Sequence, residues 1–127
     1  DFATLTGAAR VALGTEIPAL FSNNENISRK ILNNSNELSD PVWELPLFSA
    51  YERFLLSENG ALNSTGFVGT GGAITAALFL QRFVKKDTNW IHIDLMGWNT
   101  FSRPGFPKGG ESMSFRTILK TINDMFN

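Results

Sequence analysis

The sequence contains no cysteine, one histidine and one tyrosine. The absence of cysteine excludes disulfides, thiolate metal sites and a cysteine nucleophile, and it is typical of proteins from a reducing compartment. We therefore expect a cytoplasmic protein. With a single histidine, a site for two metal ions would have to use Asp, Glu, Lys or backbone ligands, because imidazole donors are scarce.

Strong net charge and long apolar runs are also absent. The 11 Lys and Arg residues nearly balance the 12 Asp and Glu residues, for a formal net charge of -1. No strong field attracts phosphate backbones or anionic lipid, so we expect no nucleic-acid partner. The longest apolar stretches, such as residues 73–80, are far shorter than the ~20 residues that cross a bilayer, so we expect no membrane span.

What is present is typical of one globular domain. The chain has 127 residues, of which 43% are hydrophobic and 18% are charged, a balance that disfavours disorder. It opens at Asp1 without an initiator methionine, a basic leader or an apolar signal core. We expect it to begin inside a strand whose neighbours are encoded upstream, and so to be a fragment.

The spacing of apolar residues predicts strands that alternate with helices, and hence an α/β layer structure. Strands are expected over residues 1–6, 17–21 and 90–95, and the last of these alternates most regularly. Helices are expected over residues 8–13, 27–32, 50–56, 74–86 and 115–126. Residues 57–72 and 99–111 are rich in glycine and polar residues and are expected to be loops.

Two of these helices carry further expectations. The Asn- and Ser-rich stretches 22–24 and 33–36 bracket the helix at 27–32, which is therefore expected to be small and at the surface. In the last helix, apolar residues recur every three or four positions, and Ser112 or Ser114 is the expected cap.

His92 and Asp94 lie two residues apart on one face of the expected strand at 90–95, which places an imidazole beside a carboxylate. A catalytic or metal-binding pair is one interpretation. The other is a partly buried, mutually satisfied pair, which is favoured because a lone histidine without further ligands makes a weak site. No serine stands in a Gly-x-Ser-x-Gly context, so a Ser-His-Asp triad is not indicated.

The glycine-rich segment Gly69–Ile74 precedes an expected helix and could present N–H groups to an anion. It lacks the Gly-Lys-Ser/Thr ending of a phosphate-binding loop and follows no clear strand. Close helix packing is therefore the favoured role of these glycines, and phosphate or nucleotide binding is the alternative.

Five blocks of sequence, in a fixed order, cover nearly the whole chain. They are Ala3–Ala8 with Val11–Gly14 and Ala19–Asn23, then Asp40–Leu47, Gly72–Leu80, Trp90–Leu95 and Pro104–Glu111. Together these blocks resemble the leucyl (cytosol) aminopeptidase family. The resemblance implies an α/β fold with a mixed sheet flanked by helices, in which residues 1–127 are the C-terminal portion of a larger catalytic domain.

The resemblance implies a dinuclear metallopeptidase that releases leucine-type N-terminal residues from peptides. In that family two divalent ions, Mn or Zn, activate a bridging water and bind the free amine of the substrate. The segments with the metal ligands, and with an arginine associated with a bicarbonate base, precede the Ala-Thr-Leu-Thr-Gly block and do not occur here. We therefore expect no catalytic or metal-binding residue in this chain, and no activity of the chain alone.

The resemblance carries over one wall of the substrate pocket. It implies that the Leu5 carbonyl and the Gly7 N–H hold the substrate backbone. It also implies that the side-chain pocket is lined by Thr4, Gly7, Met96 and Asn99, and that Thr65 flanks the next subsite. Independently of the family, residues 5–7 and 96–97 follow the ends of expected strands, where ligands gather in open α/β sheets.

Three hypotheses about function follow. The chain is part of an aminopeptidase, and the resemblance then implies a homo-hexameric parent with peptide substrates. Alternatively it is a non-catalytic assembly or packing module, in which exposed Trp and Phe residues drive self-association. The third hypothesis is a phosphate or nucleotide binder that uses the glycine-rich segment.

Overall fold

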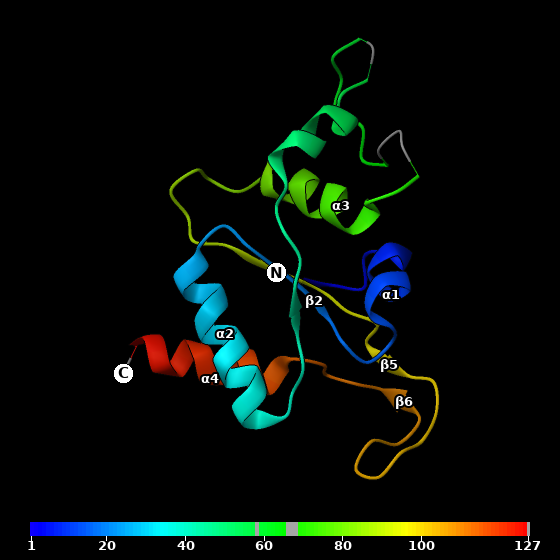
Figure 1. Cartoon of the computed structure of the whole chain (residues 1–127), viewed down its shortest axis with the longest axis vertical. Coiled ribbons are helices and arrows are strands. Elements are labelled where there is room, and N and C mark those ends of the chain that lie inside the picture. Colours follow the sequence, from blue (N-terminus) through cyan, green and yellow to red (C-terminus); the bar gives the residue numbers. More distant parts are fainter. Residues whose placement is uncertain (58, 66–68, 127) are drawn as a thin grey trace.

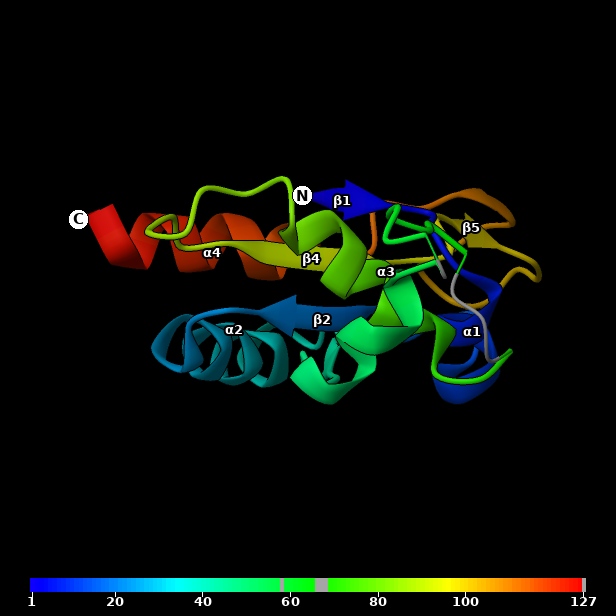
Figure 2. The same ribbon diagram turned by 90° about the horizontal axis from the view of Figure 1, so that it is seen from above.

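A four-stranded mixed sheet forms the centre of the computed structural model, which describes residues 1–57, 59–65 and 69–126. Its strands are β1 (Phe2–Ala3), β2 (Ala19–Ser22), β3 (Trp43–Glu44) and β4 (Ile91–Asp94), in the spatial order β1-β4-β2-β3. β1 is parallel to β4 and β3 is parallel to β2, whereas β2 and β4 are antiparallel. Figure 2 shows β1, β4 and β2 side by side in this order. The expected α/β fold with a mixed sheet is confirmed.

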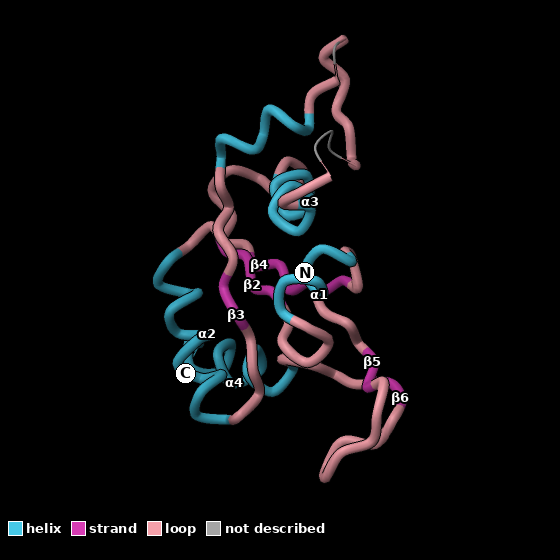
Figure 3. The backbone as a smooth tube through the Cα atoms, turned by 45° about the vertical axis from the view of Figure 1, so that its right-hand side comes forward, coloured by secondary structure: helices cyan, strands magenta, loops and turns pink. Residues whose placement is uncertain are grey.

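Helices cover both faces of this sheet. α1 (Gly7–Leu13) and α3 (Gly72–Gln81) lie on one face, and α2 (Glu25–Leu38) and α4 (Phe115–Phe126) lie on the other (Figures 1 and 3). Successive side chains of β2 point to opposite faces of the sheet, so this strand contributes core residues to the helix layer on each face. Phe21 packs in the cluster with Ala9 and Ala77, whereas Leu20 packs with Ile31 and Ile118.

A small hairpin-like sheet extends from the end of β4. It pairs β5 (Trp98–Asn99) with β6 (Gly109–Gly110) in antiparallel register. The expectation of an unbroken loop over residues 99–111 is therefore wrong at both ends of that segment.

α2 runs from Glu25 to Leu38 and is 14 residues long, so the prediction of a small surface helix at 27–32 is wrong. Asn24 caps its start, since the side-chain oxygen accepts hydrogen bonds from the N–H groups of Asn26 and Ile27. Its last turns include residues 33–36, which the composition predicts to be outside the helix.

Tertiary contacts explain this extension. Asn34 and Ser35 are buried in α2. The Asn34 amide donates to the hydroxyl of Thr121 in α4 at 3.0 Å, and the Ser35 hydroxyl accepts from the Val42 N–H at 3.1 Å. Asn and Ser side chains disfavour an isolated helix, because they compete for its backbone hydrogen bonds. They are tolerated inside a helix when residues elsewhere in the fold satisfy their hydrogen bonds.

Asp40, rather than Ser112 or Ser114, caps α4. Its two carboxylate oxygens accept hydrogen bonds from the backbone N–H groups of Ser114 (3.1 Å) and Thr117 (2.9 Å). The Ser114 hydroxyl donates instead to the carbonyl of Met113. The predicted cap is therefore wrong, because the carboxylate of Asp40, which is remote in sequence, accepts the hydrogen bonds of the N–H groups at the start of α4.

Other bounds differ from the predictions. The helix expected at 50–56 is a 3-10 helix, η1 (Ser49–Leu55), and α3 ends at Gln81, so that Lys85 and Lys86 lie beyond it. No strand is predicted at β3, which forms because the Trp43 N–H donates to the Pro18 carbonyl at 2.9 Å. In the expected loop 57–72, the described residues before α3 form no named helix or strand, and residues 58 and 66–68 lie outside the described part.

Candidate functional site

Asp94, the last residue of β4, organises the turn between β1 and α1. Its Oδ1 accepts hydrogen bonds from the backbone N–H groups of Leu5 (3.0 Å) and Thr6 (3.1 Å), and the Thr6 hydroxyl donates to Oδ2. The same hydroxyl oxygen accepts from the Ala9 N–H at 3.1 Å and so caps α1. One buried carboxylate therefore fixes the start of α1 against the end of the sheet.

The carboxyl ends of β1 and β4 meet at this edge of the sheet. The strands are parallel, with Ala3 opposite Asp94, and the Leu95 N–H donates to the Ala3 carbonyl at 3.1 Å. Gly97 has φ +66°, and a Cβ added to it would lie 3.2 Å from the Thr4 methyl carbon. The segments that follow the two strands thus lie against each other, as expected where α/β sheets bind ligands.

Arg10 links Gly7 to Met96 across this edge. One guanidinium nitrogen donates to the Met96 sulfur at 3.3 Å, and the other lies 3.6 Å from the position that a Cβ on Gly7 would occupy. Arg10 is not predicted from the sequence as a site residue. Its spacing of three residues from Gly7 on α1 was the available signal, because such residues are neighbours on a helix surface.

Asn99 and Thr65 belong to separate local networks. The Asn99 side chain is buried, and its amide donates to the Pro107 carbonyl (3.1 Å) and to Glu111 Oε2 (2.8 Å), which closes the turn between β5 and β6. The Thr65 N–H and hydroxyl both donate to Asn63 Oδ1, at 2.9 Å and 2.7 Å. Residues 59–65, which follow η1 in the chain, project from the body (Figure 1). Of the predicted site residues, the structure therefore brings Thr4, Leu5, Gly7 and Met96 together at the sheet edge, and it places Asn99 and Thr65 in networks of their own.

His92 and Asp94 do not pair with each other. The His92 Nδ1 lies 2.9 Å from Asp1 Oδ2, whereas the Asp94 oxygens accept from Leu5 and Thr6. The His92 ring is stacked with the rings of Trp90 and Phe21, with centroids at 6.0 Å and 5.9 Å. The prediction of a partly buried, mutually satisfied pair is wrong, because both side chains are almost fully buried and each has its own partners.

Burial lowers the pKa of His92 below its ordinary value of 6.5. The negative charge of Asp94 opposes this shift, and the amino group of Asp1 adds to it. Among the described residues, His92 Nε2 has no hydrogen-bond partner. The contacts of the imidazole with Phe21 and Trp90, which pack in the cluster of α1 and α3, indicate a packing role for His92.

No group of three or more His, Asp or Glu side chains is placed to hold a metal ion within the described part of the chain. His92, the one imidazole donor, is fully buried and stacked with Phe21 and Trp90. The described side chains therefore do not fit the two divalent ions that the resemblance implies.

No helix among the described residues is long and apolar enough to cross a membrane.

Gly71 and Gly72, at the start of α3, permit close packing. Gly71 has φ +66°, and a Cβ added there would lie 3.1 Å from the Tyr51 ring. A Cβ on Gly72 would lie 3.1 Å from the Ala8 side chain. These two contacts, to η1 and to α1, support the packing role of the glycine-rich segment.

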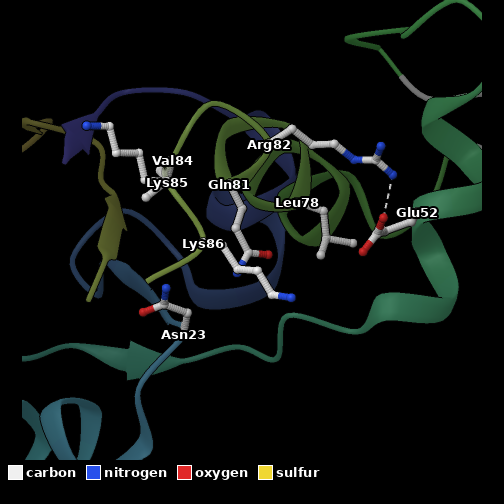
Figure 4. A pocket seen from close by; sticks show the side chains of 8 residues that line it. All are labelled: Asn23, Glu52, Leu78, Gln81, Arg82, Val84, Lys85 and Lys86. Atoms are coloured by element: carbon white, nitrogen blue, oxygen red, sulfur yellow. Dashed lines mark hydrogen bonds and ion pairs between the residues drawn. The ribbon is translucent and has the colours of Figure 1, made fainter. Parts of the chain in front are cut away.

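A cavity of about 510 Å³ lies at the other end of α3 (Figure 4). Its walls include the ion pair between Arg82 and Glu52, together with Gln81 and Lys86. None of the predicted site residues lines this cavity. It is therefore distinct from the edge where Gly7 and Met96 meet.

A class of peptidases matches this chain over most of its length. Residues 1–119 match the model of the cytosol aminopeptidase family, catalytic domain. The chain belongs to this family, as the resemblance predicts.

Named relatives and solved structures agree with this assignment. The chain is 41% identical over 129 aligned positions to a probable cytosol aminopeptidase of Buchnera aphidicola, covering all of this chain and 26% of that protein. It matches the crystal structure of the cytosol aminopeptidase from Coxiella burnetii with a TM-score of 0.93 and 43% identity, over 100% of this chain and 28% of that one. The bottromycin maturation enzyme BotP in complex with Mn matches with a TM-score of 0.88 and 33% identity, over 98% and 28% of the two chains. The chain thus spans about a quarter of the length of the relatives it matches.

Proposed function

We propose that this chain forms a wall of the substrate-binding site of a metallo-aminopeptidase, which releases leucine-type N-terminal residues from peptides. The observation that carries the proposal is the set of hydrogen bonds from Leu5 and Thr6 to the buried Asp94. These bonds hold the backbone between β1 and α1 at the ligand-binding edge of the sheet. Membership of the cytosol aminopeptidase family supports it.

Two backbone groups at this edge suit the recognition of a peptide backbone. Asp94 occupies the N–H groups of Leu5 and Thr6, so the Leu5 carbonyl is presented as an acceptor for the substrate. The Gly7 N–H lies in the first turn of α1, where N–H groups have no intrahelical acceptor. It is therefore the donor that we assign to the substrate backbone.

The side-chain pocket of the proposed site is lined by Thr4, Gly7, Met96 and Asn99, and Thr65 flanks the next subsite. A Cβ added to Gly97 would lie 3.2 Å from the Thr4 methyl carbon, and Met96 lies two residues after the end of β4, which supports the first part of this set. An apolar substrate side chain would rest on the Thr4 methyl group and on the Met96 side chain.

The two divalent ions, Mn or Zn, are held in this proposal by segments of a longer protein that precede Asp1. The chain is then the C-terminal portion of the catalytic domain and is inactive alone. The Mn complex of BotP supports a metal-dependent parent. The names of the cytosol aminopeptidase relatives support a cytoplasmic location.

A leucyl amide assay with added Mn or Zn tests the proposal. The 127-residue chain alone is expected to give no turnover. A chimera that joins the preceding part of the Coxiella burnetii enzyme to this chain is expected to restore it, and an Asp94→Ala chimera is expected to be impaired. Turnover by the chain alone, or a folded chimera without turnover, would contradict the proposal.

A second candidate function is homo-oligomeric assembly, as in a hexamer. α4 packs on α2 through its buried residues Thr117, Ile118 and Thr121. A second set of apolar residues at helical spacing remains exposed on α4, namely Phe115, Leu119, Ile122, Met125 and Phe126. Phe2, on the edge strand β1, lines a cavity together with Phe115. This exposed surface favours association, because contiguous apolar patches mark interfaces.

Light scattering over a range of concentrations tests the assembly function. The chain is expected to self-associate, and Leu119→Lys with Ile122→Lys is expected to reduce association. Val11→Lys is a matched control, since Val11 is an exposed apolar residue on a different helix, α1. A strict monomer at high concentration would count against this candidate.

A further inference from the structure

We infer that Arg10 makes the proposed site favour an acidic first residue of the peptide over its neutral amide counterpart. This inference rests on the proposed function, because that function places the first side chain of the substrate along Gly7 and Met96. Arg10 lies outside the sequence blocks that resemble the aminopeptidase family, and the resemblance does not imply a preference for acidic residues. The ligand chemistry is a carboxylate at the end of a short side chain, as in Glu or Asp.

The position of the guanidinium carries the inference. Arg10 donates to the Met96 sulfur at 3.3 Å, and its other terminal nitrogen lies 3.6 Å from the Cβ position of Gly7. The charged group therefore lies between two residues of the proposed pocket wall. A substrate side chain that runs along this wall would bring its distal atoms to the guanidinium.

The charge of Arg10 is not neutralised within the described part of the chain. Four other arginines each pair with a carboxylate, namely Arg29, Arg82, Arg103 and Arg116. The acceptor recorded for Arg10 is a thioether, which is a weak one. Guanidinium donors thus remain for a carboxylate, which they bind in a bidentate geometry.

The Met96 contact also orients the side chain. Arg10 is exposed in α1, and an exposed arginine without a partner would sample many rotamers. The contact with the Met96 sulfur places the guanidinium against the wall. A carboxylate of the substrate would replace this weak acceptor with a charge-assisted one at little cost in side-chain entropy.

The kinetic test compares glutamyl, glutaminyl and leucyl amides with the chimera described above. Glu and Gln side chains have the same shape and differ in charge, so their ratio of kcat/KM isolates the effect of the substrate charge, and its change in an Arg10 variant isolates the effect of Arg10. We expect the wild-type residue to favour glutamyl amide over glutaminyl amide by about tenfold at low salt, with a smaller ratio at high salt. Arg10→Met is expected to bring the ratio near unity, and Arg10→Lys to retain part of it.

Arg29→Met is the matched control, because Arg29 is an exposed arginine of α2 that pairs with Glu25. It is expected to leave the ratio unchanged. Leucyl turnover without a glutamyl preference, or a preference that survives Arg10→Met, would overturn the role of Arg10 while the proposed function stands. Absence of turnover with all three amides would overturn the proposed function as well.

A binding test uses the 127-residue chain itself. The side-chain N–H resonance of Arg10, assigned by its loss in Arg10→Lys, is followed by NMR during addition of glutamyl or glutaminyl dipeptides. We expect glutamyl dipeptide to shift this resonance more than the Arg29 resonance, and glutaminyl dipeptide to leave both in place. Equal shifts with the two peptides would contradict the inference.

Discussion

Asp94 and Thr6 are 88 residues apart in the sequence, yet the Thr6 N–H lies 3.1 Å from Asp94 Oδ1 and the Thr6 hydroxyl donates to Oδ2. The Leu5 N–H gives the same carboxylate a further donor at 3.0 Å. The side chain of Asp94 is almost fully buried. This one contact therefore joins the end of β4, the end of β1 and the start of α1.

Asp94→Ala is expected to destabilise the chain strongly. It leaves three donors of Leu5 and Thr6 without their acceptor, and the cost is about 3–4 kcal/mol in the free energy of unfolding. Urea denaturation followed by circular dichroism measures it. Asp87→Ala removes an exposed carboxylate and is expected to change stability by less than about 0.5 kcal/mol. Equal effects of the two substitutions would contradict the proposed role of Asp94.

Gly97→Ala is expected to disturb the sheet edge where Thr4 and Leu95 meet. The added Cβ would lie 3.2 Å from a carbon of each residue, at a backbone φ of +66°. We expect a loss of about 2 kcal/mol, measured by thermal or urea unfolding. Gly105→Ala has a similar φ of +79° with nothing within 4 Å of the new atom, so it should cost only about 1 kcal/mol.

The Thr4→Ser background separates crowding from backbone strain at Gly97. Serine lacks the methyl carbon that the new Cβ would approach. Gly97→Ala should therefore cost less in Thr4→Ser than in the wild-type chain. An unchanged cost would assign the effect to the backbone and to the contact with Leu95, and would exclude crowding by Thr4.

Asp40→Ala is expected to loosen the start of α4. The carboxylate accepts from the N–H groups of Ser114 and Thr117, and it is the tertiary cap of this helix. Loss of a helix cap costs about 1–2 kcal/mol, and the buried setting of Asp40 favours the upper end of that range. Hydrogen exchange of the first turn of α4 should accelerate, whereas exchange in α3 should not. Uniform acceleration in both helices would argue against a local cap.

Acidification is expected to reduce stability through His92. Burial lowers its pKa below 6.5, so the unfolded chain binds a proton that the folded chain does not over the pH range between the two pKa values. The free energy of unfolding should therefore fall as pH decreases from about 6.5 to the folded pKa. Above pH 6.5 the stability that depends on His92 is fully present. Denaturation midpoints at pH 7.0 and 5.5 measure this effect.

His92→Gln provides the matching test for this pH dependence. It removes the only histidine of the chain and should flatten the dependence between pH 7.0 and 5.5, whatever its own effect on stability. A wild-type slope in the variant would show that other groups, such as the Asp1 amino group, dominate the range.

The helices and strands that bury one clear face were accessible to prediction from the sequence. The alternation of residues 90–95 gives β4, and the three- and four-residue spacing of apolar side chains gives α4. The fixed order of the sequence blocks, which include those around Leu5, Asp40 and Asp94, pointed to the right family. These signals are local, since each depends on residues within one element or one short motif.

Only the tertiary structure decided which polar groups meet. α2 continues through Asn34 and Ser35 because Thr121 and Val42 satisfy them, and Asp40 displaces the nearby serines as the cap of α4. Asp94 binds Leu5 and Thr6 rather than His92, and Arg10 reaches Met96. Hydrogen bonds between residues remote in sequence have no periodic signature, because the pairing depends on where the packed layers bring each side chain.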